Sequence, residues 1–122
     1  DRDDNGNNPK CYGGSSNLST LTNNQYSIAV ASVDKDDNIS NFSSPGSNIL
    51  ISGYGDSLYT TTLNNCYGYF SGTSAATPLV AGSIGLILEA CPNLTYRDVK
   101  YILATTATKI DSSNTTWITN SA

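Results

Sequence analysis

The sequence predicts an α/β protein, because two short apolar runs and a hairpin precede two helices. Residues 26–33 and 48–52 combine β-forming and small apolar residues over strand-like lengths, which favours strands buried on both faces. Residues 74–90 are small or apolar at nearly every position, and residues 95–106 carry a narrower apolar stripe. Strands followed by helices in this order indicate an α/β protein and not a helical bundle.

The segments around the predicted strands contain turn-forming residues. Residues 1–25 are expected to form a loop, since polar residues dominate and glycine and proline interrupt them. The acidic run at 34–38 predicts a turn. Residues 59–63 and 67–70 are expected to pair as a hairpin around Asn64-Asn65, because β-forming residues flank this turn sequence.

The helix at 74–90 is apolar around nearly its whole circumference. A helix of this kind is buried inside a larger protein, and a chain of 122 residues can scarcely cover it on all sides. Cys91-Pro92 ends this helix. The second helix, 95–106, has Thr95 as its N-cap, and its apolar stripe consists of Val99, Ile102 and Leu103.

Length and composition bound the class of protein. The chain has the length of one domain, but residues 1–25 are almost all polar, so we expect it to be part of a larger domain. A net charge of −4 with few, scattered basic residues excludes nucleic-acid binding, which needs a basic patch. Residues 1–4 show no signal-peptide pattern, and the apolar stretch at 79–88 is too short to span a bilayer.

Cysteine and asparagine patterns bear on the compartment in which the protein works. The three cysteines cannot all pair within one chain, and their spacing matches no zinc motif. Five Asn-x-Ser/Thr sequons agree with a secreted protein, although an Asn-rich chain produces some by chance. Their asparagines are Asn17, Asn38, Asn41, Asn93 and Asn114.

Ser74 is the strongest candidate for a catalytic residue, because it follows Gly72-Thr73 at the start of the apolar helix. A serine nucleophile needs a base, oxyanion donors and an exposed, fixed position. A helix N-terminus supplies the last two through its free N–H groups and its dipole. Gly72 allows a tight turn, and Ala75 and Ala76 leave the surroundings uncrowded. The chain has no histidine, so a base for Ser74 has to lie elsewhere.

The same residues allow a purely structural interpretation. Thr73 or Ser74 before an alanine-rich helix is often only an N-cap, whose hydroxyl satisfies unpaired N–H groups. The motif is also not the nucleophile elbow of α/β-hydrolases. That elbow requires glycine two residues after the serine, where this chain has Ala76.

A family resemblance adds to these observations. Residues 72–82 resemble the catalytic-serine signature of subtilisin-like serine proteases, peptidase family S8, with the sequence Gly-Thr-Ser-Ala-Ala-Thr-Pro-Leu-Val-Ala-Gly. The run at 88–99 is similar more narrowly to the kexin and proprotein-convertase branch, through its Leu-Glu-Ala, Asn-Leu-Thr and Arg-Asp elements. Residues 117–120, Trp-Ile-Thr-Asn, resemble a stretch near the end of that branch's catalytic domain. The resemblance covers about residues 20–122.

The resemblance implies a subtilisin-like three-layer α/β/α sandwich with a mainly parallel sheet. Residues 1–122 would then be the C-terminal portion of the catalytic domain. The resemblance also implies that Ser74 is the nucleophile and that its own N–H forms half of the oxyanion hole. In the family an Asp, a His and an oxyanion Asn all precede the matching segment. Ser74 is therefore the one catalytic residue carried over, and this chain alone is expected to be inactive.

The resemblance further implies a calcium site, because the kexin branch carries structural calcium. An acidic ligand of that site would fall within residues 1–6, so Asp3 and Asp4 are the candidate metal ligands. This stretch begins like an EF-hand loop, but Tyr12 replaces the glutamate at the twelfth position and excludes a true EF-hand. A solvated acidic turn is the alternative interpretation.

Two cysteines carry separate expectations. Cys66 stands where the kexin-like branch has a disulfide cysteine whose partner lies upstream, near the catalytic His. Cys66 is therefore expected to be unpaired within this chain and to have a disulfide partner outside it. Cys91 closes the apolar helix and is expected to be a buried, inert thiol.

The leading hypothesis is a secreted or secretory-pathway serine endopeptidase that hydrolyses peptide bonds through an acyl-enzyme on Ser74. Its partners would be protein or peptide substrates, with an accessory domain downstream of Ala122 as a further candidate. Two competing hypotheses remain open: a calcium-dependent secreted binding module that uses residues 1–6, and a non-catalytic pseudo-protease.

Overall fold

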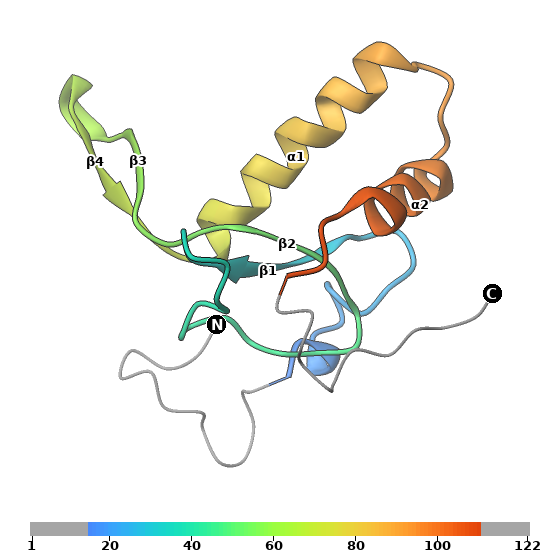
Figure 1. Cartoon of the computed structure of the whole chain (residues 1–122), viewed down its shortest axis with the longest axis horizontal. Coiled ribbons are helices and arrows are strands. Elements are labelled where there is room, and N and C mark those ends of the chain that lie inside the picture. The colour runs from blue at the N-terminus through green and yellow to red at the C-terminus, as the bar shows by residue number, and fades with distance from the viewer. Residues whose placement is uncertain (1–14, 111–122) are drawn as a thin grey trace.

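The computed structural model describes residues 15–110 of the chain (Figure 1). In chain order its elements are β1 (Ala29–Val33), β2 (Ile49–Tyr54), β3 (Leu58–Thr61), β4 (Tyr67–Phe70), α1 (Thr73–Ala90) and α2 (Tyr96–Thr106), with short 3₁₀ turns at Ser16–Leu18 and Leu63–Asn65. The predicted strands, hairpin and helices are confirmed, with element ends displaced by at most 3 residues.

β1 and β2 form a two-stranded parallel sheet. Ala29 pairs with Ile49 at one end and Val33 pairs with Tyr54 at the other. Parallel strands cannot be joined by a tight hairpin, and here residues 34–48 make the crossing. The expectation of parallel pairing is therefore confirmed for this part of the chain.

The acidic turn after β1 is held by the side chain of Asp34. Its Oδ1 accepts the backbone N–H groups of Asp36 and Asn38, both at 2.9 Å. The bond from the Asn38 N–H is the main cause that lowers the pKa of Asp34 below 3.8. The predicted turn at 34–38 is confirmed. The carboxylate of Asp34 stabilises it by accepting two backbone N–H groups of the turn.

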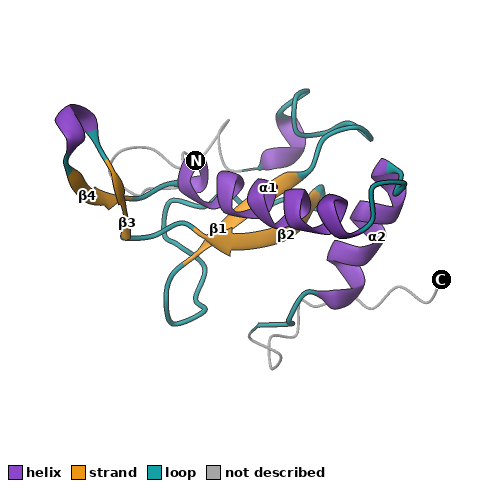
Figure 2. Ribbon diagram, turned by 90° about the horizontal axis from the view of Figure 1, so that it is seen from above, coloured by secondary structure: helices purple, strands orange, loops and turns teal. Residues whose placement is uncertain are grey.

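α1 lies across the two parallel strands (Figure 2). Gly53 of β2 makes this approach close. A Cβ atom on Gly53 would lie 3.0 Å from the backbone oxygen of Ala76 and 3.2 Å from Cγ2 of Val80. A glycine inside a strand is typical of such a close approach. The buried apolar residues of the described chain are Ala29, Val33, Ala75, Ala76, Val80, Val99 and Leu103.

Most of the α1 surface is exposed, since only 17% of its 18-residue window is buried and Leu86 is 69% exposed. Residues 15–110 therefore do not bury this helix on all sides. The whole helix is also long and apolar enough to cross a membrane by length and composition, which corrects the prediction made from residues 79–88 alone. The core helix of a soluble protein passes the same test, and α1 packs its buried residues on a sheet, so the finding is weak support for a membrane span.

β3 and β4 form an antiparallel hairpin that projects away from the parallel sheet (Figure 1). At its turn, Asn64 and Asn65 have φ values of 58° and 56°. The N–H of Cys66 donates to the carbonyl of Leu63 at 3.3 Å. Two central residues with positive φ are typical of tight hairpin turns, and asparagine tolerates this conformation better than most residues. The predicted Asn64-Asn65 turn is confirmed.

Thr95 caps α2, as predicted. Its Oγ1 accepts the N–H of Asp98 at 3.3 Å, while Oδ2 of Asp98 accepts the N–H of Thr95 at 2.8 Å. This reciprocal pair is a capping box, which satisfies two N–H groups that the helix itself cannot pair.

Thr95→Ala is expected to lower the free energy of unfolding by about 1 kcal/mol, because alanine leaves the Asp98 N–H without its acceptor. Urea unfolding of the full-length protein measures the change. Thr95→Ser keeps the hydroxyl and is the control that should retain most of the stability. Equal midpoints for the alanine variant and the wild type would show that the box contributes nothing.

The contribution of Asp98 is expected to disappear in acid. The hydrogen bond from the Thr95 side chain is the main cause that holds the pKa of Asp98 below 3.8 in the folded chain. In the unfolded chain an aspartate has a pKa of about 3.9, so the carboxylate stabilises the fold above this pH and loses the effect as pH falls through the folded pKa. Asp98→Ala should therefore be less stable than wild type at about pH 6, with a smaller difference in stability at about pH 2. A difference that is the same at both pH values would contradict this.

Candidate active site

Ser74 occupies the second position of α1, and its side chain is exposed. The N-cap is Gly72, with φ 144° and ψ 161°. Residues other than glycine rarely adopt this conformation. The structural interpretation that made Thr73 or Ser74 the N-cap is therefore wrong, because both residues already lie inside the helix.

The first turn of α1 leaves a backbone donor beside the Ser74 hydroxyl. The Gly72 carbonyl accepts the N–H groups of Ala75 at 2.9 Å and Ala76 at 3.3 Å. Within residues 15–110, no backbone carbonyl accepts the N–H of Ser74. This N–H and the positive end of the helix dipole are available to an anion that forms next to Ser74 Oγ.

Three hydrogen bonds hold the start of α1 against the segment that follows β2. The N–H of Gly72 donates to the Gly55 carbonyl at 2.7 Å. Oγ of Ser71 accepts the N–H of Ser57 at 2.8 Å and donates to Oδ1 of Asp56 at 3.0 Å. These contacts place the start of α1 at the carboxyl end of a parallel strand, the end at which open α/β sheets bind ligands.

A buried serine cluster lies behind this junction. Ser32, Ser40 and Ser43 are 0%, 3% and 2% exposed. The N–H of Ser32 donates to Oγ of Ser43 at 3.0 Å, and the hydroxyl oxygens of Ser32 and Ser40 are 2.8 Å apart. A Cβ atom on Gly55 would lie 2.5 Å from Oγ of Ser32, so the cluster directly backs the strand end. Because these hydroxyls are buried and bonded to one another or to backbone, we assign them a structural role.

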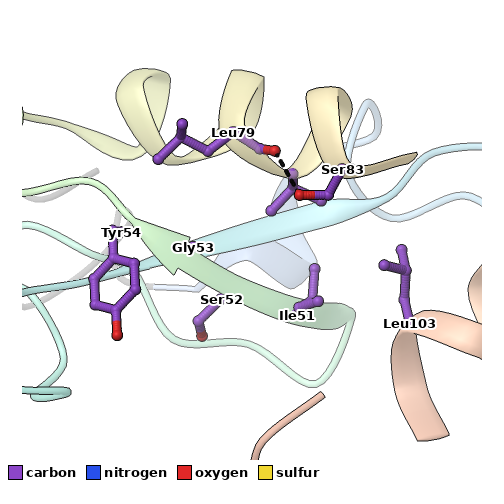
Figure 3. Close-up of a pocket in the computed structure, with 8 residues that line it drawn as sticks. Ile51, Ser52, Gly53, Tyr54, Leu79, Ser83 and Leu103 are labelled. Atoms are coloured by element: carbon purple, nitrogen blue, oxygen red, sulfur yellow. Dashed lines mark hydrogen bonds between the residues drawn. The ribbon is translucent and has the colours of Figure 1, made fainter. Parts of the chain in front are cut away.

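A pocket of about 200 Å³ lies between β2, α1 and α2 (Figure 3). Its lining residues are Ile51, Ser52, Gly53, Tyr54, Leu79, Val80, Ser83 and Leu103. The Ser83 hydroxyl donates to the Leu79 carbonyl at 3.0 Å and is therefore occupied within the helix. Ser74 is not among the lining residues, and Leu79 lies more than one helical turn beyond it, so the pocket does not include the nucleophile.

Sequence reasoning found Ser74 and missed the residues that hold it in place. Asp56 and Ser71 are 15 positions apart in the chain, so no local motif links them. Gly53 and Gly55 could have indicated that the end of β2 lies against another segment, because glycines near the end of a strand often mark a close backbone approach.

The expectations for the cysteines and for the calcium site fare differently in the structure. Cys66 and Cys91 are both free and exposed, so the expectation of a buried Cys91 is wrong for the described chain. Asp3 and Asp4 lie outside the described residues. Among residues 15–110, no group of three His, Cys, Asp or Glu side chains could hold a metal ion, and the calcium site at residues 1–6 stays a prediction.

Comparison with known proteins places this geometry in a family. The sequence profile of the Subtilase family, Peptidase_S8, matches residues 3–118. The chain is 39% identical over 108 residues to "Kexin" of Candida albicans (strain WO-1), which covers 84% of this chain and 12% of that protein. It is 41% identical over 86 residues to "Subtilisin DY" of Bacillus licheniformis, which covers 70% of this chain and 31% of that protein.

Solved structures agree with the sequence matches. The crystal structure of a cold-adapted subtilisin-like serine proteinase superposes with a TM-score of 0.67 at 32% identity, and the match covers 72% of this chain and 32% of that one. The chain thus spans 12% of the kexin and 31% of the subtilisin that it matches. Its parallel strands and helices are those of a subtilisin-like α/β fold. The chain therefore belongs to the subtilase family, peptidase S8, and within it resembles the kexin-like branch.

Proposed function

We propose that this chain carries the nucleophile of a kexin-like serine endopeptidase. The observation that carries the proposal is the exposed Ser74, the second residue of α1, whose own N–H finds no backbone acceptor within residues 15–110. Membership of a serine peptidase family supports it. Because the chain has no histidine and spans 12% of its kexin relative, the base would come from residues outside 1–122.

In the proposed reaction, Oγ of Ser74 attacks the carbonyl carbon of the scissile bond while its proton passes to that external histidine. Negative charge develops on the carbonyl oxygen, where the Ser74 N–H and the dipole of α1 would stabilise it. One oxyanion donor lowers the barrier by about 3–4 kcal/mol. The histidine then protonates the leaving amine, and water hydrolyses the acyl-enzyme and restores Ser74.

We infer that the substrates are proteins or peptides and that the enzyme works in the secretory pathway or outside the cell. Asn38, Asn41 and Asn93 belong to three of the sequons and are exposed, which agrees with passage through that pathway.

The test is active-site labelling of the full-length protein with a fluorophosphonate probe, followed by mass spectrometry to find the labelled residue. Label on Ser74 is the expected result, lost in Ser74→Ala and retained in the surface control Ser47→Ala. Folded protein without label would instead favour the pseudo-protease or the binding module. Calcium affinity that is lost in Asp3→Ala, in protein that takes no label on Ser74, would favour the binding module.

A further inference from the structure

We propose that Asp56 and Ser71 are positioning residues that hold Ser74 in place for attack. The proposal rests on the proposed function, in which Ser74 is the nucleophile. We call the hydrogen bonds among Asp56, Ser57 and Ser71 the Asp56–Ser71 clamp. It joins the segment after β2 to the residue before the N-cap of α1.

The clamp uses the Ser71 hydroxyl twice, as acceptor from the Ser57 N–H at 2.8 Å and as donor to the Asp56 carboxylate at 3.0 Å. Hydrogen bonds to a charged group are stronger than those between neutral groups. Ser57 has a φ of 56°, in the left-handed region that serine seldom adopts. A conformation of this kind persists only where the surrounding contacts hold it, and the bond from its N–H to Ser71 is such a contact.

The clamp acts on Ser71, three residues before Ser74. Gly72, between the clamp and the nucleophile, has the wide backbone freedom of glycine. The preceding strand, β4, belongs to the projecting hairpin, where Tyr69 is 77% exposed and Phe70 is 47% exposed. Together with the hydrogen bond between Gly72 and Gly55, the clamp therefore fixes where the chain enters α1. A shift of about 1 Å at a reacting atom lowers a rate by about 100-fold.

A positioning role and a purely structural role predict different kinetics. Loss of a structural contact lowers the stability of the protein and leaves the turnover of the folded fraction unchanged. Loss of positioning lowers kcat while KM stays near its original value, because the transition state and not the bound substrate depends on the place of Oγ. The rate of reaction with a fluorophosphonate should fall in parallel with kcat.

The experiment compares Asp56→Ala and Ser71→Ala with wild type in the full-length protein, using a peptide substrate and the fluorophosphonate rate. We expect kcat to fall by about 10-fold to 100-fold, with KM within about twofold. Asp56→Asn and Ser71→Thr keep an acceptor and a hydroxyl, and should recover most of the rate. The matched controls Asp36→Ala and Ser47→Ala, on exposed loops, should behave as wild type.

Amide hydrogen exchange of Gly72 and Ala75, whose N–H groups are hydrogen-bonded at this junction, provides a second readout that needs no activity. Both amides should exchange about 10-fold faster in Asp56→Ala than in wild type, since the entry into α1 is then less restrained. An active wild type with unchanged kcat and unchanged exchange in Asp56→Ala would overturn the clamp and leave the proposed function intact. An inactive, unlabelled wild type would overturn the proposed function, and the exchange result would still decide whether the clamp orders the start of α1.

Discussion

Ser74→Ala in the full-length protein is expected to abolish peptide hydrolysis while it leaves the free energy of unfolding unchanged. The side chain is exposed, and Gly72 is the N-cap, so alanine removes no capping interaction. Loss of the nucleophile should lower kcat by about 10⁶-fold, which is the size of the effect when subtilisin loses its nucleophilic serine. The kcat for a peptide substrate and urea unfolding of the same preparation measure the two quantities.

Thr95→Ala is the matched control for this pair of measurements, because it removes a real N-cap at the start of α2. It should lower stability and leave kcat unchanged, the reverse of the Ser74 result. A Ser74→Ala variant that keeps full turnover would end the assignment of Ser74 as nucleophile. A variant that keeps turnover and also loses about 1 kcal/mol of stability would return Ser74 to the role of helix cap.

The elements with local signals could be predicted from the sequence. Thr95 and Asp98 lie three residues apart, and their side chains and backbones satisfy each other without help from the rest of the chain. Asn64 and Asn65 tolerate the positive φ that a tight hairpin requires, so the turn is specified by two adjacent residues. In both cases the physical cause lies within a few residues of chain.

The surroundings of Ser74 could not be predicted in the same way. The N-cap rule favours serine or threonine over glycine, but the chain enters α1 at a φ of 144°, which only Gly72 adopts without strain. The acceptor for the Gly72 N–H is the carbonyl of Gly55, and the whole β3–β4 hairpin separates these two residues in the sequence. Such contacts depend on how β2 and α1 pack, and no short sequence pattern encodes them.

The exposed apolar surface of α1 explains why the expectation of a buried Cys91 failed. Within residues 15–110, Leu79 and Leu86 of this helix are 47% and 69% exposed. The expectation of a buried Cys91 assumed that cover for this helix would be present. Residues 15–110 do not provide it, so the thiol at the end of the helix is exposed as well.

Gly55→Ala is expected to lower the free energy of unfolding by about 1–3 kcal/mol and to lower kcat at the same time. The added Cβ would lie 2.5 Å from Oγ of Ser32, 2.7 Å from the backbone oxygen of Gly72 and 3.0 Å from Cβ of Ala76. The Ser32 hydroxyl is buried and bonded to Ser40, so it cannot move aside freely. The Gly72 oxygen accepts the first bonds of α1, so relief on that side displaces the start of the helix that carries Ser74.

Gly68→Ala in β4 is the matched control for Gly55→Ala. There the contact for an added Cβ is Cγ2 of Thr62 at 3.2 Å, a methyl group on an exposed side chain that can rotate away. The control should change the urea midpoint little and leave kcat intact, which separates the effect of a methyl group from the effect of its position. If Gly55→Ala were as stable and as active as Gly68→Ala, the end of β2 would not lie against the start of α1. The hydrogen bonds that position Ser74 would then need another explanation.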